Sequence, residues 1–168
     1  MKWLGIPKED TKFLRAPSTI YTCLLPTAFA THAFSLPAGD VFVVAMDTGA
    51  NAFLFPPSFV IPGTQRPTRK TLVSAAGPSA NSTLDVALVC FGLRDSTNHV
   101  HYFRFWAFIS STLPLTLFSH SRLKQMDFGF DFDNRLGLTY QGMFFPFRLD
   151  DGHYIADIFL WDGTDVFF

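Results

Sequence analysis

Apolar residues along this chain fall into short runs that are separated by turn-forming residues, and aromatic and β-branched side chains dominate many of these runs. Runs of this kind favour strands over helices. A single short helix is expected over residues 119–126, with Ser119 or Ser121 as its N-cap. The pattern predicts an all-β protein with strands at 41–47, 52–55, 70–76, 84–93 and 100–109, and two more after residue 142, divided by residues 150–152.

Two of the predicted strands are joined by a segment of small residues. Residues 77–82 read Gly-Pro-Ser-Ala-Asn-Ser and lie between the strands 70–76 and 84–93. Glycine, proline, serine and asparagine are the common residues of turns. The sequence therefore predicts a hairpin with a small-residue tip, followed by a second turn over residues 94–98.

One strand delivers an acidic side chain into a tight turn. Residues 41–46 are apolar, Asp47 follows them directly, and Thr48 and Gly49 come next. Gly49 allows the backbone to turn where a side chain would obstruct it. Asp-Thr-Gly is also good chemistry for an ordinary solvated turn. Because such turns seldom follow six apolar residues, we interpret Asp47 as a candidate catalytic residue.

Residues 41–50 resemble the active-site segment of the retropepsins, the aspartic proteases of retroviruses and long-terminal-repeat retrotransposons. Residues 71–78 resemble the flap of that family, and residues 114–123 resemble the Leu-Leu-Ser-x-Ser-x-Leu segment of Copia-type retrotransposon proteases. The three segments occur in the order found in the family. The chain differs from many retroviral enzymes in that no Gly-Arg follows Leu117.

The resemblance implies a retropepsin-like closed β-barrel, half of an acid protease, with a flap hairpin and one short helix. It covers residues 36–135 as the protease domain. Residues 1–35 are then an N-terminal extension, and residues 136–168 a C-terminal β extension that leads to the next polyprotein segment. Because the chain contains one Asp-Thr-Gly, two copies would have to combine, and a homodimer is expected.

The resemblance also implies a reaction. Two Asp47 carboxylates, one from each subunit, would share a proton and activate a water that attacks the peptide bond. No metal or other cofactor is needed. The expected substrate is a Gag-Pol polyprotein, processed in the cytoplasm and in virus-like particles. The implied catalytic residues are Asp47, Thr48 and Gly49, and the implied substrate-binding residues are Ala50, Ala75, Ala76 and Gly77.

Composition adds a second functional hypothesis. The chain has 21 phenylalanines, many of them clustered in residues 53–55, 103–108 and 128–132. These clusters predict a packed β core, or an exposed aromatic surface if the domain associates with another protein. The alternative function is therefore a catalytically inactive, Phe-rich β interaction module or capsid-associated module.

Net charge, the length of the apolar segments and cysteine content argue against a nucleic-acid-binding protein, a membrane-spanning protein and a disulfide scaffold. The formal net charge is -1 and no basic run occurs, so direct binding to nucleic acid is not expected. No apolar segment is long enough to span a bilayer, so no membrane partner is expected. Cys23 and Cys90 are too few for a disulfide scaffold, and we interpret both as buried thiols.

Two pairs of polar residues have side chains of the types that bind metal ions. His99 and His101 are two residues apart on a predicted strand, but no third ligand follows at a suitable spacing. We interpret them as surface or pairing histidines. Asp131 and Asp133 lack the glycine and the distal glutamate of a calcium loop, so we interpret them as solvated.

Overall fold

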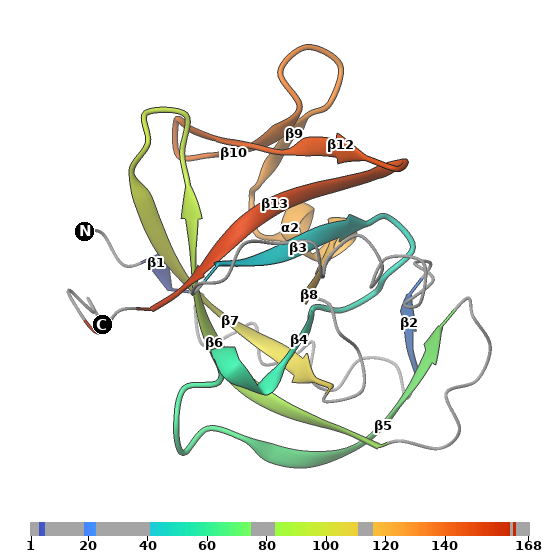
Figure 1. Cartoon of the computed structure of the whole chain (residues 1–168). Coiled ribbons are helices and arrows are strands. Elements are labelled where there is room, and N and C mark those ends of the chain that lie inside the picture. The colour runs from blue at the N-terminus through green and yellow to red at the C-terminus, as the bar shows by residue number, and fades with distance from the viewer. Residues whose placement is uncertain are drawn as a thin grey trace.

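A computed structural model describes residues 4–5, 19–22, 41–74, 83–110, 116–161 and 163 of the 168-residue chain, and these residues form a mostly β protein (Figure 1). The helices among these described residues are the 3₁₀ helix η2 (Pro57–Phe59) and the α-helix α2 (His120–Gln125). The strands are β1 (Leu4–Gly5), β2 (Thr19–Thr22), β3 (Val41–Asp47), β4 (Leu54–Phe55), β5 (Arg66–Ser74), β6 (Thr83–Arg94), β7 (Val100–Ile109), β8 (Thr116–Ser119), β9 (Gly129–Asp131), β10 (Gly137–Tyr140), β11 (Met143–Pro146), β12 (Arg148–Asp150) and β13 (His153–Leu160).

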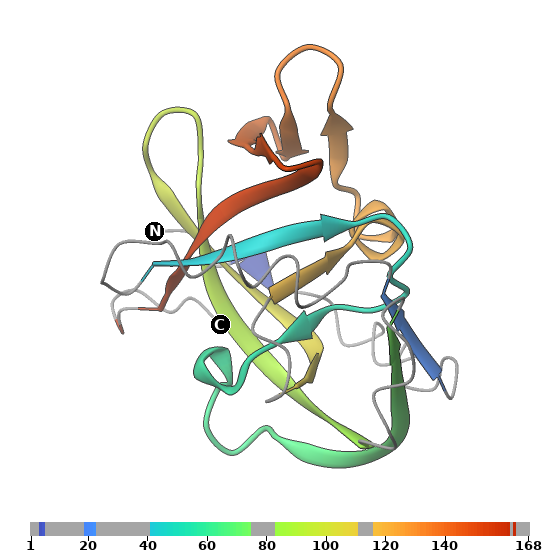
Figure 2. The same ribbon diagram turned by 45° about the vertical axis from the view of Figure 1, so that its right-hand side comes forward.

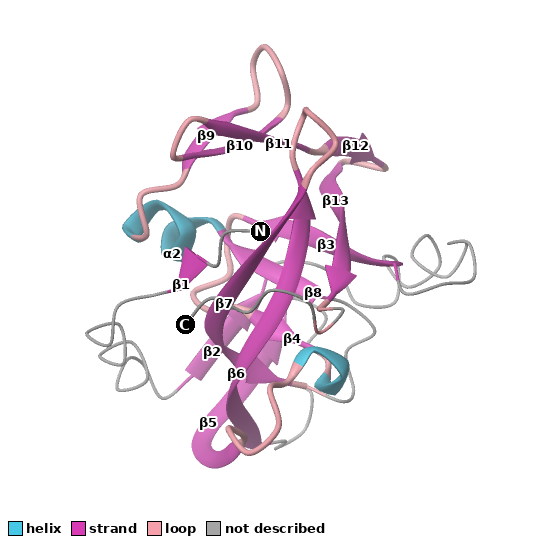
Figure 3. Ribbon diagram, turned by 90° about the vertical axis from the view of Figure 1, so that its left-hand side faces the viewer, coloured by secondary structure: helices cyan, strands magenta, loops and turns pink. Residues whose placement is uncertain are grey.

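Most of these strands belong to one sheet, in the order β1-β7-β4-β8-β3-β13-β6-β5-β2. In addition, β6 pairs with β7, so the hydrogen-bonded path that leaves β7 through β4 returns to it through β6. The strand β12 pairs with β13. A second sheet, in the order β11-β10-β9, lies at one end of the molecule (Figure 3).

Among the described strands, β6 and β7 form the longest antiparallel pair, and Figure 3 shows them running along the length of the main sheet. The register of this pair runs from Asp85 opposite Ile109 to Arg94 opposite Val100. Side chains alternate between two faces of a strand, and β6 follows that rule, because Val89 and Phe91 enter one core cluster while Val86 enters another. The strands predicted over 84–93 and 100–109 are confirmed.

The phenylalanine clusters form the core. Phe53 stacks on Phe105 with 5.1 Å between ring centroids, and Phe91 lies 5.3 Å from Phe118. Aromatic pairs at such distances gain stabilisation beyond the burial of their surface. The prediction of a packed β core is confirmed, and the exposed large apolar residues of the described part are Leu149 and Trp161. The fully buried phenylalanines are Phe53, Phe55, Phe91, Phe103, Phe105, Phe108, Phe118 and Phe145.

A tight hairpin joins the last two strands of the main sheet. Asp151 and Gly152 have φ of 47° and 80° and join β12 to β13, whose residues Asp150 and His153 are paired. A two-residue connection with positive φ at both positions matches the twist of the flanking strands. The predicted division at 150–152 is confirmed, although β11, β12 and β13 make three strands after residue 142 where the sequence pattern predicted two.

Residues 136–168, predicted as a C-terminal extension, contribute two strands, β12 and β13, to the main sheet. Ile155 of β13 lies opposite Ala45 of β3, and Ile158 lies opposite Leu93 of β6. Figure 1 shows β13 alongside β3. The predicted N-terminal extension contributes as well, because β1 pairs with β7 and β2 pairs with β5.

Candidate active site

The strand that carries Asp47 is held on both edges. β3 is antiparallel to β13 on one side and parallel to β8 on the other. β8 itself lies between β3 and β4, with Leu117 paired to Leu54 (Figure 2). A central strand that is covered on both faces is apolar throughout, which explains the run before Asp47, where Val44 and Ala45 have no exposed surface.

The Asp47 carboxylate has a defined orientation at the end of β3. Its Oδ1 accepts a hydrogen bond of 2.9 Å from the amide of Gly49, and the carbonyl of Asp47 accepts one of 3.4 Å from the amide of Ala50. This is the local geometry in which an aspartate side chain bonds to the backbone two residues ahead. Asp47 is 1% exposed, whereas Thr48 and Gly49 are exposed.

A buried serine joins this turn to the helix that follows β8. Ser119 is paired with Asp47 in the register of β3 and β8, and it has no exposed surface. Its hydroxyl donates to the Ala50 carbonyl at 2.8 Å and accepts from the amide of Arg122 at 3.3 Å. The second bond is the N-cap of α2, so the structure selects Ser119 rather than Ser121 as the cap.

The structure brings together two of the three segments on which the family resemblance was based. The turn 47–50 and the segment 116–123 are in contact through β3, β8 and Ser119. Ala50 is 2% exposed, so its side chain packs inside the protein. The predicted flap residues Ala75, Ala76 and Gly77 lie outside the described residues, and β5 and β6, which lead to and from them, are antiparallel.

The bond between Ser119 and Ala50 was not predicted. The two residues are 69 positions apart, and the sequence pattern indicated only that Ser119 or Ser121 caps a helix. The one available signal was the resemblance of both segments to one protease family. A hydrogen bond between distant residues leaves no local pattern in the sequence.

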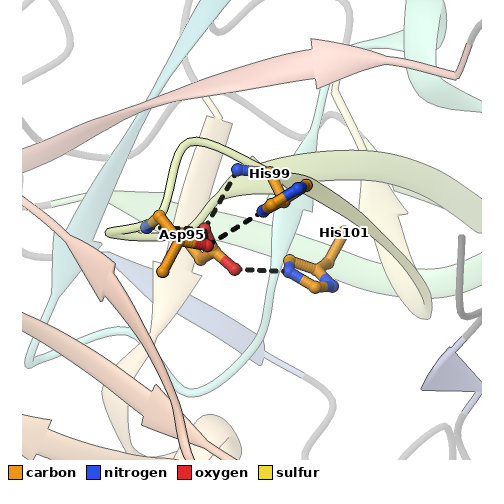
Figure 4. Close-up of polar contacts among 4 residues, drawn as sticks. Asp95, His99 and His101 are labelled. Carbon is orange, nitrogen blue, oxygen red and sulfur yellow. Dashed lines mark hydrogen bonds and ion pairs between the residues drawn. The ribbon is translucent and has the colours of Figure 1, made fainter.

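A second polar cluster lies at the turn between β6 and β7. Asp95 is 8% exposed, and its carboxylate contacts the Nε2 of His101 at 2.7 Å and the amide of His99 at 3.0 Å (Figure 4). It also accepts hydrogen bonds from the amide and the hydroxyl of Thr97, at 2.8 and 2.7 Å. Burial raises the pKa of Asp95, but these hydrogen bonds together outweigh it and hold the pKa well below its usual range.

His101 is therefore a pairing histidine, as predicted. The ring of His99 lies 2.9 Å from the hydroxyl of Thr97, measured from its Nδ1. Within the described ranges, no three histidine, cysteine, aspartate or glutamate side chains are grouped as a metal site.

Asp131 and Cys90, two further residues singled out in the sequence, have surroundings that explain them by a structural role. Asp131 accepts hydrogen bonds from the side chain of Arg135 at 3.1 Å and from the amide of Asn134 at 3.2 Å. The bond from Arg135, with that from Asn134, lowers the pKa of Asp131. Burial raises the pKa of Cys90 to about 12, which confirms a buried thiol, while Cys23 lies outside the described residues.

Comparisons with known protein families, with curated proteins and with solved structures found no match to this chain. Across the part of the chain that the structure describes, none of the helices combines the length and the apolar character that crossing a bilayer requires.

Proposed function

We propose that this chain is a retropepsin-like aspartic endopeptidase of a Copia-type retrotransposon, which cleaves a Gag-Pol polyprotein as a homodimer. The observation that carries the proposal is the placement of Asp47. Its carboxylate ends a buried strand that is paired on both edges, in an Asp-Thr-Gly turn where the Gly49 amide donates to Oδ1 at 2.9 Å. A catalytic carboxylate has to be held in one geometry by the surrounding structure.

The arrangement of the strands supports the finer fold assignment. The pairing path closes from β7 through β4, β8, β3, β13 and β6 back to β7, as a closed retropepsin-like barrel requires. The antiparallel arms β5 and β6 provide the base of a hairpin that the proposal assigns as the flap. In this assignment, residues 75–77 cover an extended peptide substrate and exclude water from the reaction.

The proposed reaction uses the Asp47 carboxylates of two subunits. Two adjacent carboxylates do not both ionise easily, so the pair shares one proton. The ionised member accepts a proton from a water as the water attacks the peptide carbonyl, and the protonated member stabilises the developing oxyanion. Because Asp47 is 1% exposed in the single chain, the reaction needs a dimer arrangement that admits a water to its carboxylate.

The test is cleavage of a mixed-sequence peptide library by wild type and by Asp47→Asn. Because general acid–base groups contribute about a hundredfold or more to a rate, we expect Asp47→Asn to lower the cleavage rate by at least that factor. Asp133→Asn removes an exposed carboxylate outside the turn and should leave cleavage unchanged. The wild-type rate should rise more steeply than linearly with protein concentration, and it should fall at both low and high pH.

Two outcomes would contradict the proposal. The first is an Asp47→Asn protein that cleaves as well as wild type. The second is a folded, dimeric wild type that cleaves no peptide in the library, which would favour the interaction or capsid-associated module instead.

A further inference from the structure

A pocket lies beside β13, at the point where its neighbouring strand changes from β12 to β6. Ile155 of β13 is paired with Arg148 of β12, and Ile158 is paired with Leu93 of β6. Ala156 and Asp157 lie between these two pairings. The pocket at this place has a volume of about 260 Å³ and is lined by residues of β6, β12, β13 and the end of β11.

The floor of the pocket is apolar and its rim is charged. Leu93, Phe147 and Ala156 are between 2% and 6% exposed and form the floor. Arg94, Arg148 and Asp157 contribute two positive charges and one negative charge to the rim. Arg148 and Asp157 form an ion pair with 3.0 Å between Nη1 and Oδ1, so these two charges compensate each other. Within the described part of the chain, the charge of Arg94 is the one on the rim that no ion pair compensates.

Arg94 is held in place by neutral groups. Its Nη1 donates a hydrogen bond of 2.8 Å to the side-chain oxygen of Asn98, and its guanidinium carbon lies 4.8 Å from the ring centroid of Phe159. Among the described residues, no carboxylate pairs with Arg94. The stacked ring and the amide reduce the freedom of a long side chain, so less conformational entropy is lost when an anion binds to it.

We propose that this pocket binds a carboxylate carried on a small apolar group. The guanidinium of Arg94 donates paired hydrogen bonds to the carboxylate, which matches its planar geometry. The apolar part of the ligand lies against Leu93, Phe147 and Ala156. A pocket of this volume is slightly smaller than typical ligand sites and admits a group of a few heavy atoms. Such a carboxylate belongs either to a small carboxylic acid or to the C-terminal residue of a polypeptide.

The pocket is separate from the Asp47 turn. Asp157 lies opposite Val43, four residues before Asp47, which is roughly 13 Å along the strand. The proposal therefore does not rest on protease activity, and its test does not use cleavage.

The experiment is an NMR titration of the full chain with 4-methylpentanoate and with the matching neutral amide, 4-methylpentanamide. We expect the acid to shift the amide signals of Leu93 and Ala156 and to bind at least tenfold more tightly than the amide. Arg94→Gln should weaken binding of the acid at least tenfold. Arg135→Gln is the matched control, because Arg135 is also exposed and stacks on an aromatic ring, with 4.2 Å to Phe144, but lies outside the pocket. It should change the affinity less than twofold.

A second variant is expected to bind the acid more tightly than wild type does. Asp157→Asn removes the negative charge from the rim and releases Arg148, so it should tighten binding of the acid severalfold. A gain of affinity cannot result from loss of folding. The proposal is overturned if acid and amide bind equally, if neither binds, or if Arg94→Gln keeps wild-type affinity.

Two peptides distinguish the sources of the carboxylate. A hexapeptide that ends in leucine with a free carboxylate is compared with the same peptide ending in an amide. Binding of the free-acid peptide at least tenfold tighter than 4-methylpentanoate assigns a polypeptide C-terminus as the ligand. Equal affinity of the two acids, with no binding of the peptide amide, assigns a small carboxylic acid.

Discussion

At the scale of single residues, the hydroxyl of Ser119 makes two hydrogen bonds that connect the Asp47 turn to the helix α2. It donates to the Ala50 carbonyl in the Asp47 turn and accepts from the Arg122 amide at the start of α2. Ser119 has no exposed surface, so water cannot readily replace either bond. A buried polar group that loses its partner costs more than the bond itself contributed. The orientation of the turn and the start of the helix therefore depend on one side chain.

We expect Ser119→Ala to lower the free energy of unfolding by about 1–3 kcal/mol, because it removes the N-cap and leaves the Ala50 carbonyl without its donor. Urea denaturation followed by circular dichroism measures this change. Ser121→Ala is the control, since Ser121 is exposed and its hydroxyl is 3.2 Å from that of Ser119. Equal stability of the two variants would show that the buried bonds contribute little.

At the scale of elements, the turn between β6 and β7 depends on one carboxylate. Asp95 accepts hydrogen bonds from Thr97 and His99 and pairs with His101, and these bonds keep its pKa below the value of an unfolded aspartate. A folded-state pKa that is lowered contributes stability above the unfolded pKa, which is about 3.9. That stability is lost as the pH falls through the unfolded pKa toward the folded one.

Asp95→Asn should therefore be less stable than wild type at pH 7, by roughly 1–2 kcal/mol, and the difference should shrink as the pH is lowered from about 5 to 3. Unfolding free energies of both proteins across this pH range measure the effect. Asp133→Asn, which alters an exposed carboxylate, should show no such convergence. If the unfolding free energies of Asp95→Asn and wild type differ by the same amount over the whole pH range, the pKa of Asp95 is not lowered in the folded protein.

At the scale of the whole molecule, β13 connects parts of the main sheet that are distant in sequence. It pairs with β3 over residues 155–159 and with β6 over residues 158–160. Ile155, Ala156 and Ile158 are each at most 5% exposed. Removal of this strand would uncover apolar surface and leave the backbone groups of two long strands unpaired.

We expect a chain that ends at residue 135, the predicted end of the protease domain, to lose cooperative unfolding. It lacks β13 and also the buried Leu138 and Phe145. A chain that ends at residue 161 keeps all of these elements and serves as the control. Urea titrations of both chains measure the difference. A sharp transition in the shorter chain would show that residues 1–135 fold cooperatively without β13.

Local features of the fold were predictable because their causes are local. The strand β7 was predicted at its observed bounds, since ten residues rich in aromatic side chains lie between a turn signal and Ser110. A helix cap at Ser119 or Ser121 and a division between strands at residues 150–152 were predicted from residue preferences that act over two to four positions, and the structure has the cap at Ser119 and a turn at Asp151-Gly152. The short strand β8 was missed, because four buried residues leave a weak pattern.

The amino-acid sequence by itself determined an all-β protein with a phenylalanine core and an Asp-Thr-Gly turn after an apolar strand. Only the tertiary structure decided that β8 lies between β3 and β4, that β13 joins β3 to β6, and that Ser119 bonds to Ala50. It also decided that Arg94 borders a pocket. The physical reason is that strand formation and turns depend on neighbouring residues, whereas the partner of a strand edge or a buried hydroxyl is selected by packing among residues distant along the chain.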